Sequence, residues 1–233
     1  DEFQDISQDR RCMLQGLLSQ NDKIKLFGVG DDWQSIYRFA GSDINIITHF
    51  SEYFGITAEN YLTQTFRSFQ GIVDVASKFI QKNPGQLTKK VKAHQQVDAK
   101  QVILRSYDPG EYRSMDDQYR QIEKLLGILH QKAIDARHKL TVFFLGRYNK
   151  LLPPKLGRYQ SHYKQLQIDF KSIHASRGLE ADYVILLSVE DLGFRFPSIK
   201  EDDELLSLVM PHPETFNHAE ERRLMYVAIT RAK

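Results

Sequence analysis

The sequence predicts an α/β fold with a mainly parallel sheet, because segments with helical apolar spacing alternate with short apolar runs of strand length. The segments with helical spacing are 9–20, 68–85 and 116–131. The runs with the length of buried strands are 23–31, 101–107, 140–146, 167–173 and 182–189. Polar clusters directly follow two of these runs, at the edge of a parallel sheet where ligands bind.

Each predicted helix has one apolar face. The residues on these faces, in chain order, are Met13, Leu14, Leu17 and Leu18; Ile72, Val73, Ala76, Phe79 and Ile80; and Tyr119, Ile122, Leu125, Leu126 and Leu129. The first helix also carries Cys12, which we expect to pack in the core. The second helix should stop at Asn83-Pro84-Gly85, because proline and glycine end helices.

The predicted strands are short and apolar. KIKLFGVGD, from Lys23, predicts a buried strand that ends at Gly30 and Asp31. QVILRSY, LTVFFLG, QIDFKSI and DYVILLSV predict further strands. The stretch from Asp191 to His218, with its prolines and its acidic EDDE, predicts a long loop that carries one short apolar helix at 205–210.

The composition is that of a globular protein. The chain has 233 residues, 41% of them hydrophobic, which suffices for one large domain or two small ones. A formal net charge of +2 is too small to identify a nucleic-acid-binding protein, so such a function must rest on local residues. No apolar run reaches the roughly 18 residues of a membrane helix, and we expect no membrane association. The single cysteine excludes an internal disulfide and fits a reducing cytoplasm.

The chain opens with the carboxylates of DEFQD. Asp1 and Glu2 form a pair of the kind that phosphoryl transfer requires, in which one carboxylate holds Mg²⁺ and the other orients or deprotonates a water. The alternative is a solvated surface pair or charges at a helix N-terminus.

A second polar cluster is GDDWQSIYRFAG, residues 30–41. Gln34 lies a few residues after a predicted strand, where it could sense a terminal phosphate. Tyr37 and Phe39 could offer aromatic faces on which unpaired bases stack. The alternative is a loop whose aromatic residues belong to the core.

Two arginines are further candidates. Arg67, in TFRS, precedes a predicted helix and could be a capping or surface charge. In AEERRLMYVAITRAK, helical spacing places Arg231 on one apolar stripe with Leu224 and with Val227 or Ala228, so Arg231 should leave the helix from its apolar face. Its guanidinium there needs an anionic partner, either an internal carboxylate or a ligand phosphate. The charged residues 220–223 are expected to form a solvated face and capping charges.

The segment IHASRGLEADYVILL places a turn with Gly178 and an isolated Glu180 between two predicted strands. A lone histidine such as His174 is usually structural, and its spacing gives no metal site.

Five segments of the chain, in order, resemble motifs two to six of the UvrD/Rep family of superfamily 1 DNA helicases: DEFQD, GVGDDWQSIYRF, YLTQTFRS, IHASRGLEADYVILL and EERRLMYVAITRAK. The resemblance implies a helicase core of RecA-like parallel sheets flanked by helices. Residues 1–64 would be the last part of the first motor domain, and residues 65–233 a nearly complete second domain. Such proteins move 3′ to 5′ along single-stranded DNA and hydrolyse ATP bound between the two domains.

The resemblance also implies roles for the first-domain residues. Asp1 would help to hold Mg²⁺, and Glu2 would activate the attacking water. Gln34 would contact the γ-phosphate of ATP and couple it to DNA. Tyr37 and Phe39 would stack on bases, with Phe39 in the place of the family's usual tryptophan.

In the second domain the resemblance makes Arg67 and Arg231 arginine fingers toward the γ-phosphate. Gly178 and Glu180 would contribute to nucleotide binding, with Glu180 on the ribose, and His174 would lie on the DNA path.

Some features depart from the family pattern. Ala40 and Arg177 stand where arginine and lysine are usual, so these two contacts differ. No GxGK[ST] phosphate loop occurs in the chain, so we expect the isolated chain to be inactive. The interval between Arg67 and His174 is too short for a large accessory domain.

Two alternatives stay open beside a helicase motor. One is the motor part of a helicase-nuclease, and the other is a non-catalytic DNA-binding or assembly module. The complete set of Asp1, Glu2, Gln34, Arg67 and Arg231 argues against the module, which has no need of a water-activating glutamate. For a motor, we expect a monomer that binds single-stranded DNA or its junction with duplex DNA.

Overall fold

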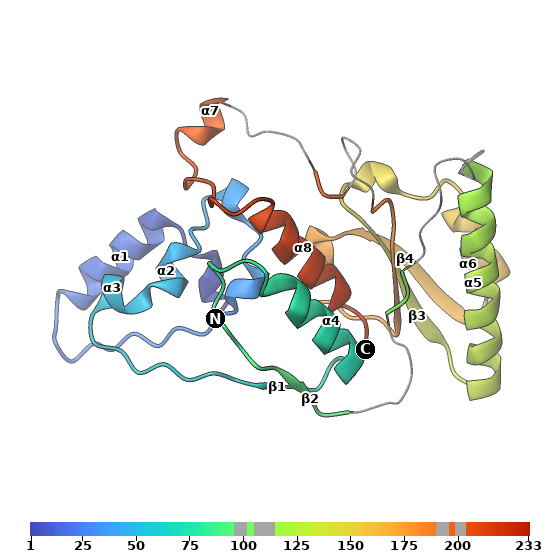
Figure 1. Ribbon diagram of the computed structural model, residues 1–233, viewed down its shortest axis with the longest axis horizontal. Helices are drawn as coiled ribbons and strands as arrows, with labels where there is room; N and C mark the ends of the chain where they lie inside the picture. The colour runs from blue at the N-terminus through green and yellow to red at the C-terminus, as the bar shows by residue number, and fades with distance from the viewer. Residues whose placement is uncertain (96–101, 105–114, 190–195, 199–203) are drawn as a thin grey trace. The chain divides into compact units, whose positions relative to one another are not determined.

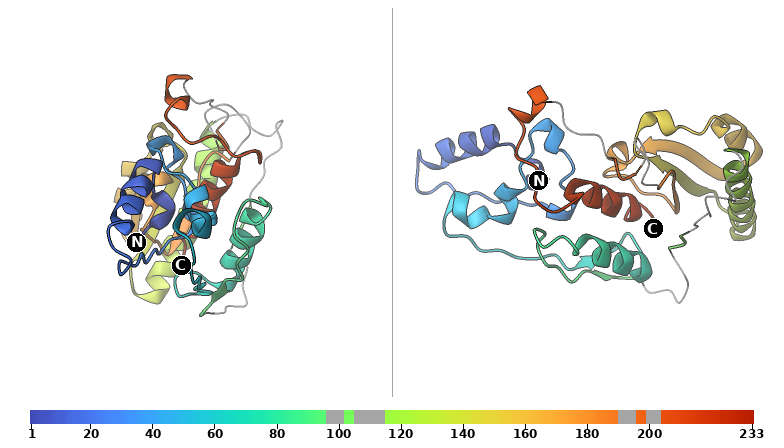
Figure 2. Two further views of the ribbon diagram at one scale, coloured as in Figure 1. Left: turned by 90° about the vertical axis from the view of Figure 1, so that its left-hand side faces the viewer. Right: turned by 45° about the horizontal axis from the view of Figure 1, so that its top comes forward.

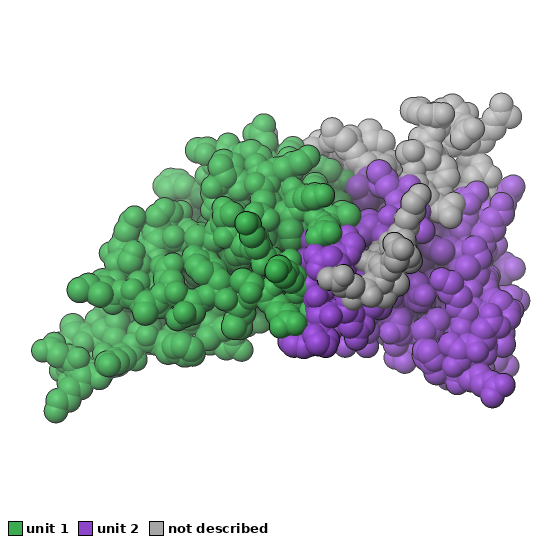
Figure 3. Space-filling view, turned by 60° about the horizontal axis from the view of Figure 1, so that its bottom comes forward, with its two compact units in different colours: residues 1–65, 74–92, 190–227 green, residues 66–73, 93–189, 228–233 purple. Residues whose placement is uncertain are grey.

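The computed structural model describes residues 1–95, 102–104, 115–189, 196–198 and 204–233. The chain forms two compact units, each built from several segments (Figure 3). Unit 1 comprises Asp1–Thr65, Asp74–Lys92 and Glu190–Val227, and unit 2 comprises Phe66–Val73, Ala93–Val189 and Ala228–Lys233. The predicted division into motor domains between residues 64 and 65 stays a prediction.

A three-stranded parallel sheet forms the centre of unit 2. Strand β3 (Leu140–Gly146) lies between β4 (Leu166–Ser172) and β5 (Tyr183–Leu186), and both neighbours run parallel to it. The strands coincide with the apolar runs LTVFFLG, QIDFKSI and DYVILLSV to within a few residues. The predicted α/β class with a parallel sheet is therefore confirmed.

Helices α5 (Met115–Ala136) and α6 (Leu156–His162) cover one face of this sheet (Figure 1, Figure 2). Alternate β3 residues Val142 and Phe144 point to the helices, as the two-residue period of a strand requires. The buried residues of this core are Tyr119, Ile122, Leu126, Leu129, Ala133, Leu140, Val142, Phe144, Tyr159, Leu166, Ile168 and Leu187. The predicted helix at 116–131 is thus confirmed, and its apolar face is the one that packs.

Unit 1 has a smaller aromatic core. Helix α1 (Gln8–Leu18) is N-capped by Ser7, whose hydroxyl accepts a hydrogen bond from the Arg10 amide. Two short helices, α2 (Asn45–Thr48) and α3 (Phe50–Phe54), follow. The core consists of Phe3, Ile6 and Ile46, with Leu14, Phe50 and Phe54 packed against them.

Two predictions for unit 1 are wrong. The segment 23–31 is not a strand: Phe3 N donates to Val29 O at 2.8 Å, but the chain beside it, Phe3–Asp5, forms a 3-10 helix and cannot continue a ladder of paired hydrogen bonds. Phe27 is consequently 88% exposed. Cys12 is exposed rather than in the core, because α1 packs mainly through Leu14 and leaves the rest of its predicted apolar face half-buried or exposed.

The remaining elements flank these cores. Helix α4 (Gln70–Ile80) buries Ile72, Val73, Ala76 and Ile80, half-buries Phe79, and ends just before the predicted stop. Short strands β1 (Gln64–Thr65) and β2 (Lys92–Ala93) pair with each other. Helices α7 (Glu204–Ser207) and α8 (Ala219–Ile229) complete the described fold, together with the 3-10 helices Asp32–Gln34, Arg38–Ala40, Asn149–Leu151 and His174–Ser176.

Two predictions concern residues near the gaps. Of the run 101–107, only 102–104 are described, and they form no strand. The short apolar helix predicted at 205–210 is the single turn α7, and the residues 190–195 and 199–203 of its predicted loop lie outside the described part of the chain. None of the helices in the described ranges is long and apolar enough to cross a membrane.

Candidate functional site

A chain of hydrogen bonds joins Glu2 to Gln34 in unit 1. Glu2 adopts the left-handed conformation, with φ 55°, just before the 3-10 helix Phe3–Asp5. Gln4 Nε2 donates to Glu2 Oε2, and Gln4 Oε1 accepts from the Asp31 amide at 2.8 Å. Gln34 Nε2 in turn donates to Asp31 Oδ2 at 2.7 Å. The predicted water-activating carboxylate and the predicted phosphate sensor therefore belong to one network.

Lys89 closes this network from the segment after α4. Its Nζ lies 2.7 Å from Asp31 Oδ1 and 2.5 Å from Asp32 Oδ1. Asp32 is fully buried, and its second oxygen accepts from the Leu87 amide at 2.9 Å. Burial raises the pKa of Asp32 against the opposing attraction of Lys89. Burial alone would lower the pKa of Lys89, but the charges of Asp31 and Asp32 outweigh it and raise that pKa, so the lysine is charged.

Trp33 holds the same turn in the core. Its side chain is fully buried, and its Nε1 donates to Leu87 O at 2.9 Å. Lys89 Nζ lies 5.0 Å from the Trp33 ring centroid, within the range of a cation–π interaction, and Tyr226 packs edge-on against the same ring. The turn 31–34 is thus fixed from two sides by residues 87–89.

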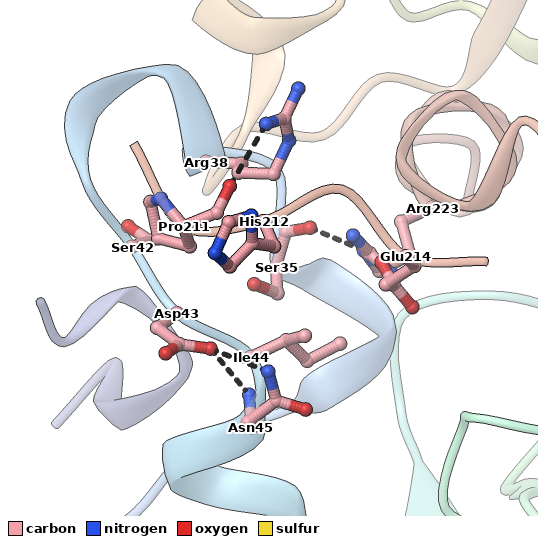
Figure 4. Close-up of a pocket in the computed structure, with 10 residues that line it drawn as sticks. All are labelled: Ser35, Arg38, Ser42, Asp43, Ile44, Asn45, Pro211, His212, Glu214 and Arg223. Atoms are coloured by element: carbon pink, nitrogen blue, oxygen red, sulfur yellow. Dashed lines mark hydrogen bonds and ion pairs between the residues drawn. The ribbon is translucent and has the colours of Figure 1, made fainter. Parts of the chain in front are cut away.

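A buried arginine ties the same region of unit 1 to α8 (Figure 4). Arg223 is only 1% exposed; its Nε donates to the carbonyl oxygen of Ser35, and its Nη1 pairs with Glu214 Oε2. Arg38 donates to Pro211 O at 3.1 Å and pairs with Glu220 at 3.3 Å.

The prediction that 220–223 form a solvated face is therefore wrong. Burial raises the pKa of Glu220, partly opposed by Arg38. The sequence EERR does not indicate this burial, because Glu220 pairs with Arg38, which is far away in sequence, and Arg223 donates to the equally distant Ser35 carbonyl as well as pairing with Glu214.

The two aromatic candidates differ in exposure from their buried neighbours. Trp33 and Ile36 are fully buried, whereas Phe39 is 55% exposed and Tyr37 is half-buried. The rings of Tyr37 and Phe39 meet edge to face with centroids 5.8 Å apart. The alternative that all aromatics of this loop are core is thus wrong for Phe39, whose ring is largely exposed.

In unit 2, three segments distant in sequence come together. Arg67 Nε lies 3.4 Å from Glu180 Oε2, and Lys233 Nζ lies 3.1 Å from Glu180 Oε1. The Ser68 hydroxyl donates to the carbonyl oxygen of Ala232. These cations lower the pKa of Glu180, with the hydrogen bond from Lys233 as the largest cause. TFRS, SRGLEAD and TRAK therefore form one cluster of charged side chains.

Arg231 supports this cluster from inside the fold. It is 1% exposed and lies just beyond the end of α8, not within the helix as its spacing predicts. Its Nη1 donates to Leu179 O at 3.3 Å, and its Nη2 donates to the Thr230 hydroxyl at 3.3 Å. The Ala181 amide donates to Arg231 O at 3.0 Å, so the backbones of the two motifs are joined.

The remaining candidates lie in the turn after β4. His174 begins the 3-10 helix His174–Ser176 and is half-buried, as is Arg177. Gly178 adopts φ 80°, a conformation that favours glycine, and no atom lies within 4 Å of the place of a Cβ. This glycine is therefore required by the turn that presents Glu180, and it leaves open space beside it.

Asp1 and Glu2 are the residues that could hold a divalent cation. Both are exposed, and the Asp1 carboxylate accepts from the Glu2 amide at 2.9 Å. Within the described ranges no three His, Cys, Asp or Glu side chains form a metal-binding group. Because Mg²⁺ takes few protein carboxylates and completes its shell with water and phosphate oxygens, the exposed pair fits that ion.

Sequence reasoning missed three residues of these networks: Gln4, Lys89 and Arg223. Gln4 stands inside DEFQD, where only the carboxylates attracted notice. Lys89 and Arg223 carry no local signal, because Lys89 pairs with Asp31 and Arg223 donates to the Ser35 carbonyl, both of them remote in sequence.

Comparisons with known proteins match both units. The family model of the UvrD-like helicase C-terminal domain matches residues 112–233, and that of the UvrD/REP helicase N-terminal domain matches residues 1–55. DNA helicase IV of Escherichia coli is 40% identical over the whole chain, which covers 32% of that protein. The wording GDDWQSIYRF and EERRLMYVAITRA predicts similarity to helicase IV within the family, and this identity confirms it.

Other relatives are more distant. A probable DNA helicase of Mycoplasma pneumoniae is 28% identical over the whole chain, which covers 41% of that protein. The ATP-dependent DNA helicase PcrA of Leuconostoc citreum is 36% identical over 39% of the chain and 12% of its own length. The chain thus spans less than half the length of each of these relatives.

Proposed function

Because the chain belongs to the UvrD-like helicase family, we propose that it is part of the motor of an ATP-dependent DNA helicase that moves 3′ to 5′ along single-stranded DNA. The observation that carries the proposal is the cluster of Arg67, Glu180 and Lys233, drawn from three distant motifs, with Arg231 bonded to the carbonyl oxygen of Leu179 beside Glu180. Guanidinium groups are suited to phosphate oxygens, and such a cluster suits a nucleoside triphosphate.

Unit 1 supplies the residues for hydrolysis in this proposal. ATP with Mg²⁺ would bring the phosphoryl group and neutralise its charge. Asp1 would hold the cation, and Glu2 would accept a proton from the attacking water. The bond from Gln4 orients Glu2, and Gln34, on a turn that is fixed in the core, would present its amide to the terminal phosphate.

Unit 2 supplies positive charge and nucleotide contacts. The Arg67 side chain is partly exposed, so it can leave Glu180 for a phosphate oxygen. Glu180, freed from that pair, can accept from the ribose hydroxyls beside the open space at Gly178. Arg231 is held in place by Leu179 and Thr230, so its guanidinium needs little reorganisation when charge grows in the transition state.

DNA would contact the exposed aromatic surface of unit 1. Phe39 and Tyr37 offer ring faces to unpaired bases, and His174 lies on the proposed DNA path in unit 2. The proposal includes the two motor domains 1–64 and 65–233, a monomeric protein, and a cytoplasmic location.

The test is ATP hydrolysis by the protein expressed from its complete gene, with and without single-stranded DNA. Arg231→Ala should lower the DNA-stimulated kcat on the order of a thousandfold, as loss of an arginine finger does, while ATP binding survives. Arg158→Ala is the matched control, because Arg158 is an exposed arginine of α6 that lies outside the motif sequences. If the wild type shows no DNA-stimulated turnover, the chain is a non-catalytic module instead.

The 233-residue polypeptide by itself should not hydrolyse ATP, because it contains no GxGK[ST] phosphate loop. Turnover by the purified polypeptide above that of its Glu2→Gln variant would contradict this part of the proposal.

A further inference from the structure

Lys89 makes more contacts than a surface lysine needs. Its side chain is 13% exposed, and its Nζ contacts Asp31, Asp32 and the Trp33 ring at once. Asp32 is a fully buried carboxylate, so one cation in this place is needed for charge balance. Charge balance for Asp32 does not explain why Lys89 also contacts Asp31.

Asp31 divides its two oxygens between two partners. Oδ1 accepts from Lys89 at 2.7 Å, and from the Trp33 amide at 3.2 Å. Oδ2 accepts from Gln34 Nε2 at 2.7 Å. The backbone of Asp31 is also fixed, since its amide donates to Gln4. Rotation of this carboxylate would move the acceptor of Gln34, and the ion pair with Lys89 opposes that rotation.

We propose that Lys89 is a positioning residue, which orients the Gln34 amide by holding the Asp31 carboxylate between them. The inference rests on the proposed function, in which Gln34 meets the terminal phosphate. Lys89 acts indirectly: it lies outside the sequence motifs and contacts Asp31, which in turn accepts from Gln34, the residue that would meet the phosphate.

Three variants of the protein from its complete gene test the kinetic consequence. Lys89→Met should lower the DNA-stimulated kcat about tenfold and change the KM for ATP less than twofold. Lys89→Arg, which keeps the charge, should recover part of that loss. Lys90→Met is the matched control, because Lys90 is the adjacent exposed lysine, and its kcat should stay within twofold of wild type.

A double-variant cycle separates positioning from a general structural role. In a Gln34→Ala background, Lys89→Met should lower kcat less than twofold, because the group it positions is gone. An undiminished tenfold loss in that background would overturn the proposal. Asp31→Asn keeps the ion pair of Lys89 with the buried Asp32, so this variant should fold even if Lys89→Met does not. It should show the same loss of kcat as Lys89→Met.

Crystal structures of the wild type and of Lys89→Met test whether Lys89 positions Gln34, and they require no activity measurement. Gln34 Nε2 should leave Asp31 Oδ2 in the variant, to a separation beyond 3.5 Å. If it stays in place, Lys89 does not position Gln34. If instead the wild type lacks DNA-stimulated turnover, the proposed function fails, while the structures still show whether Lys89 orients Gln34.

Discussion

The hydroxyl of Tyr159 lies in the core of unit 2 without a hydrogen-bond partner among the described residues, although the residue is only 1% exposed. Its ring stacks on Phe144 with centroids 6.3 Å apart. Tyr159→Phe keeps the ring and removes an unpaired buried hydroxyl, so it should stabilise unit 2 by about 1 kcal/mol. Hydrogen exchange of the β3 amides should slow about fivefold.

Tyr163→Phe is the matched control for this variant. Its hydroxyl donates to Glu123 O at 3.1 Å, so its loss should make the same amides exchange faster. If both variants change exchange in the same direction, the unpaired state of Tyr159 has no energetic consequence.

The same hydroxyl gives the stability of unit 2 a dependence on alkaline pH. Burial, followed by the charge of Glu123, raises the pKa of Tyr159 to about 12 from 10.0. The tyrosine of the unfolded chain therefore ionises at a lower pH than that of the folded chain. The free energy of unfolding keeps its full value below pH 10, and on the order of 2–3 kcal/mol of it is lost as the pH rises to about 12. Urea unfolding at several pH values should show a smaller alkaline loss for Tyr159→Phe than for wild type; equal losses would contradict the assignment.

At the scale of elements, the attachment of α8 within unit 1 depends on a buried ion pair. Arg223→Met leaves the Ser35 carbonyl without its donor and Glu214 without its cation, so it should destabilise the α8 contact by about 3 kcal/mol. Exchange of the α8 amides at 219–227 should accelerate about a hundredfold.

The neighbouring arginine of the same helix provides the comparison. Arg222 lies over the rings of Phe79 and Phe216, at 5.3 and 5.1 Å, so Arg222→Met should cost about 1 kcal/mol or less. Equal effects of the two substitutions would show that helix propensity, rather than the ion pair, determines the stability of α8.

Elements differed in how far the sequence predicted them. The strands β3 to β5 and the helix α5 are long apolar or periodic segments that pack against one another, so local pattern and tertiary packing agree. The run 23–31 has the same apolar pattern, but a strand also needs a neighbour to pair with, and Phe3–Asp5 turns into a 3-10 helix beside it. The pattern of apolar residues indicates which side chains are buried, but it does not indicate whether a neighbouring strand is available for backbone hydrogen bonds.

Across the whole molecule, the resemblance of the motifs predicted which residues could form the site, and the structure adds how they are held. Glu2 and Gln34 were expected from DEFQD and GDDWQ, and Arg67 and Glu180 from their motifs. Lys89 could not be expected, because its partners are Asp31 and Asp32, far away in sequence and recognisable only once the chain has folded.

In the proposed function, coupling of ATP turnover to DNA belongs to the whole molecule, and Phe39 provides a test of it. The ring is 55% exposed and is not needed for the core, so Phe39→Ala should leave the fold and the DNA-independent ATPase intact. Loss of one stacking partner should weaken single-stranded DNA binding by about 1–3 kcal/mol, and DNA should stimulate turnover only at correspondingly higher concentrations.

Phe27→Ala is the control, because Phe27 is a more exposed aromatic outside the motifs, and its substitution should not change the DNA concentration for half-maximal stimulation. Because stacking carries no charge, the salt dependence of DNA binding should be the same in the Phe39 variant and the wild type; a change in its slope would instead indicate that this turn contributes through phosphate contacts.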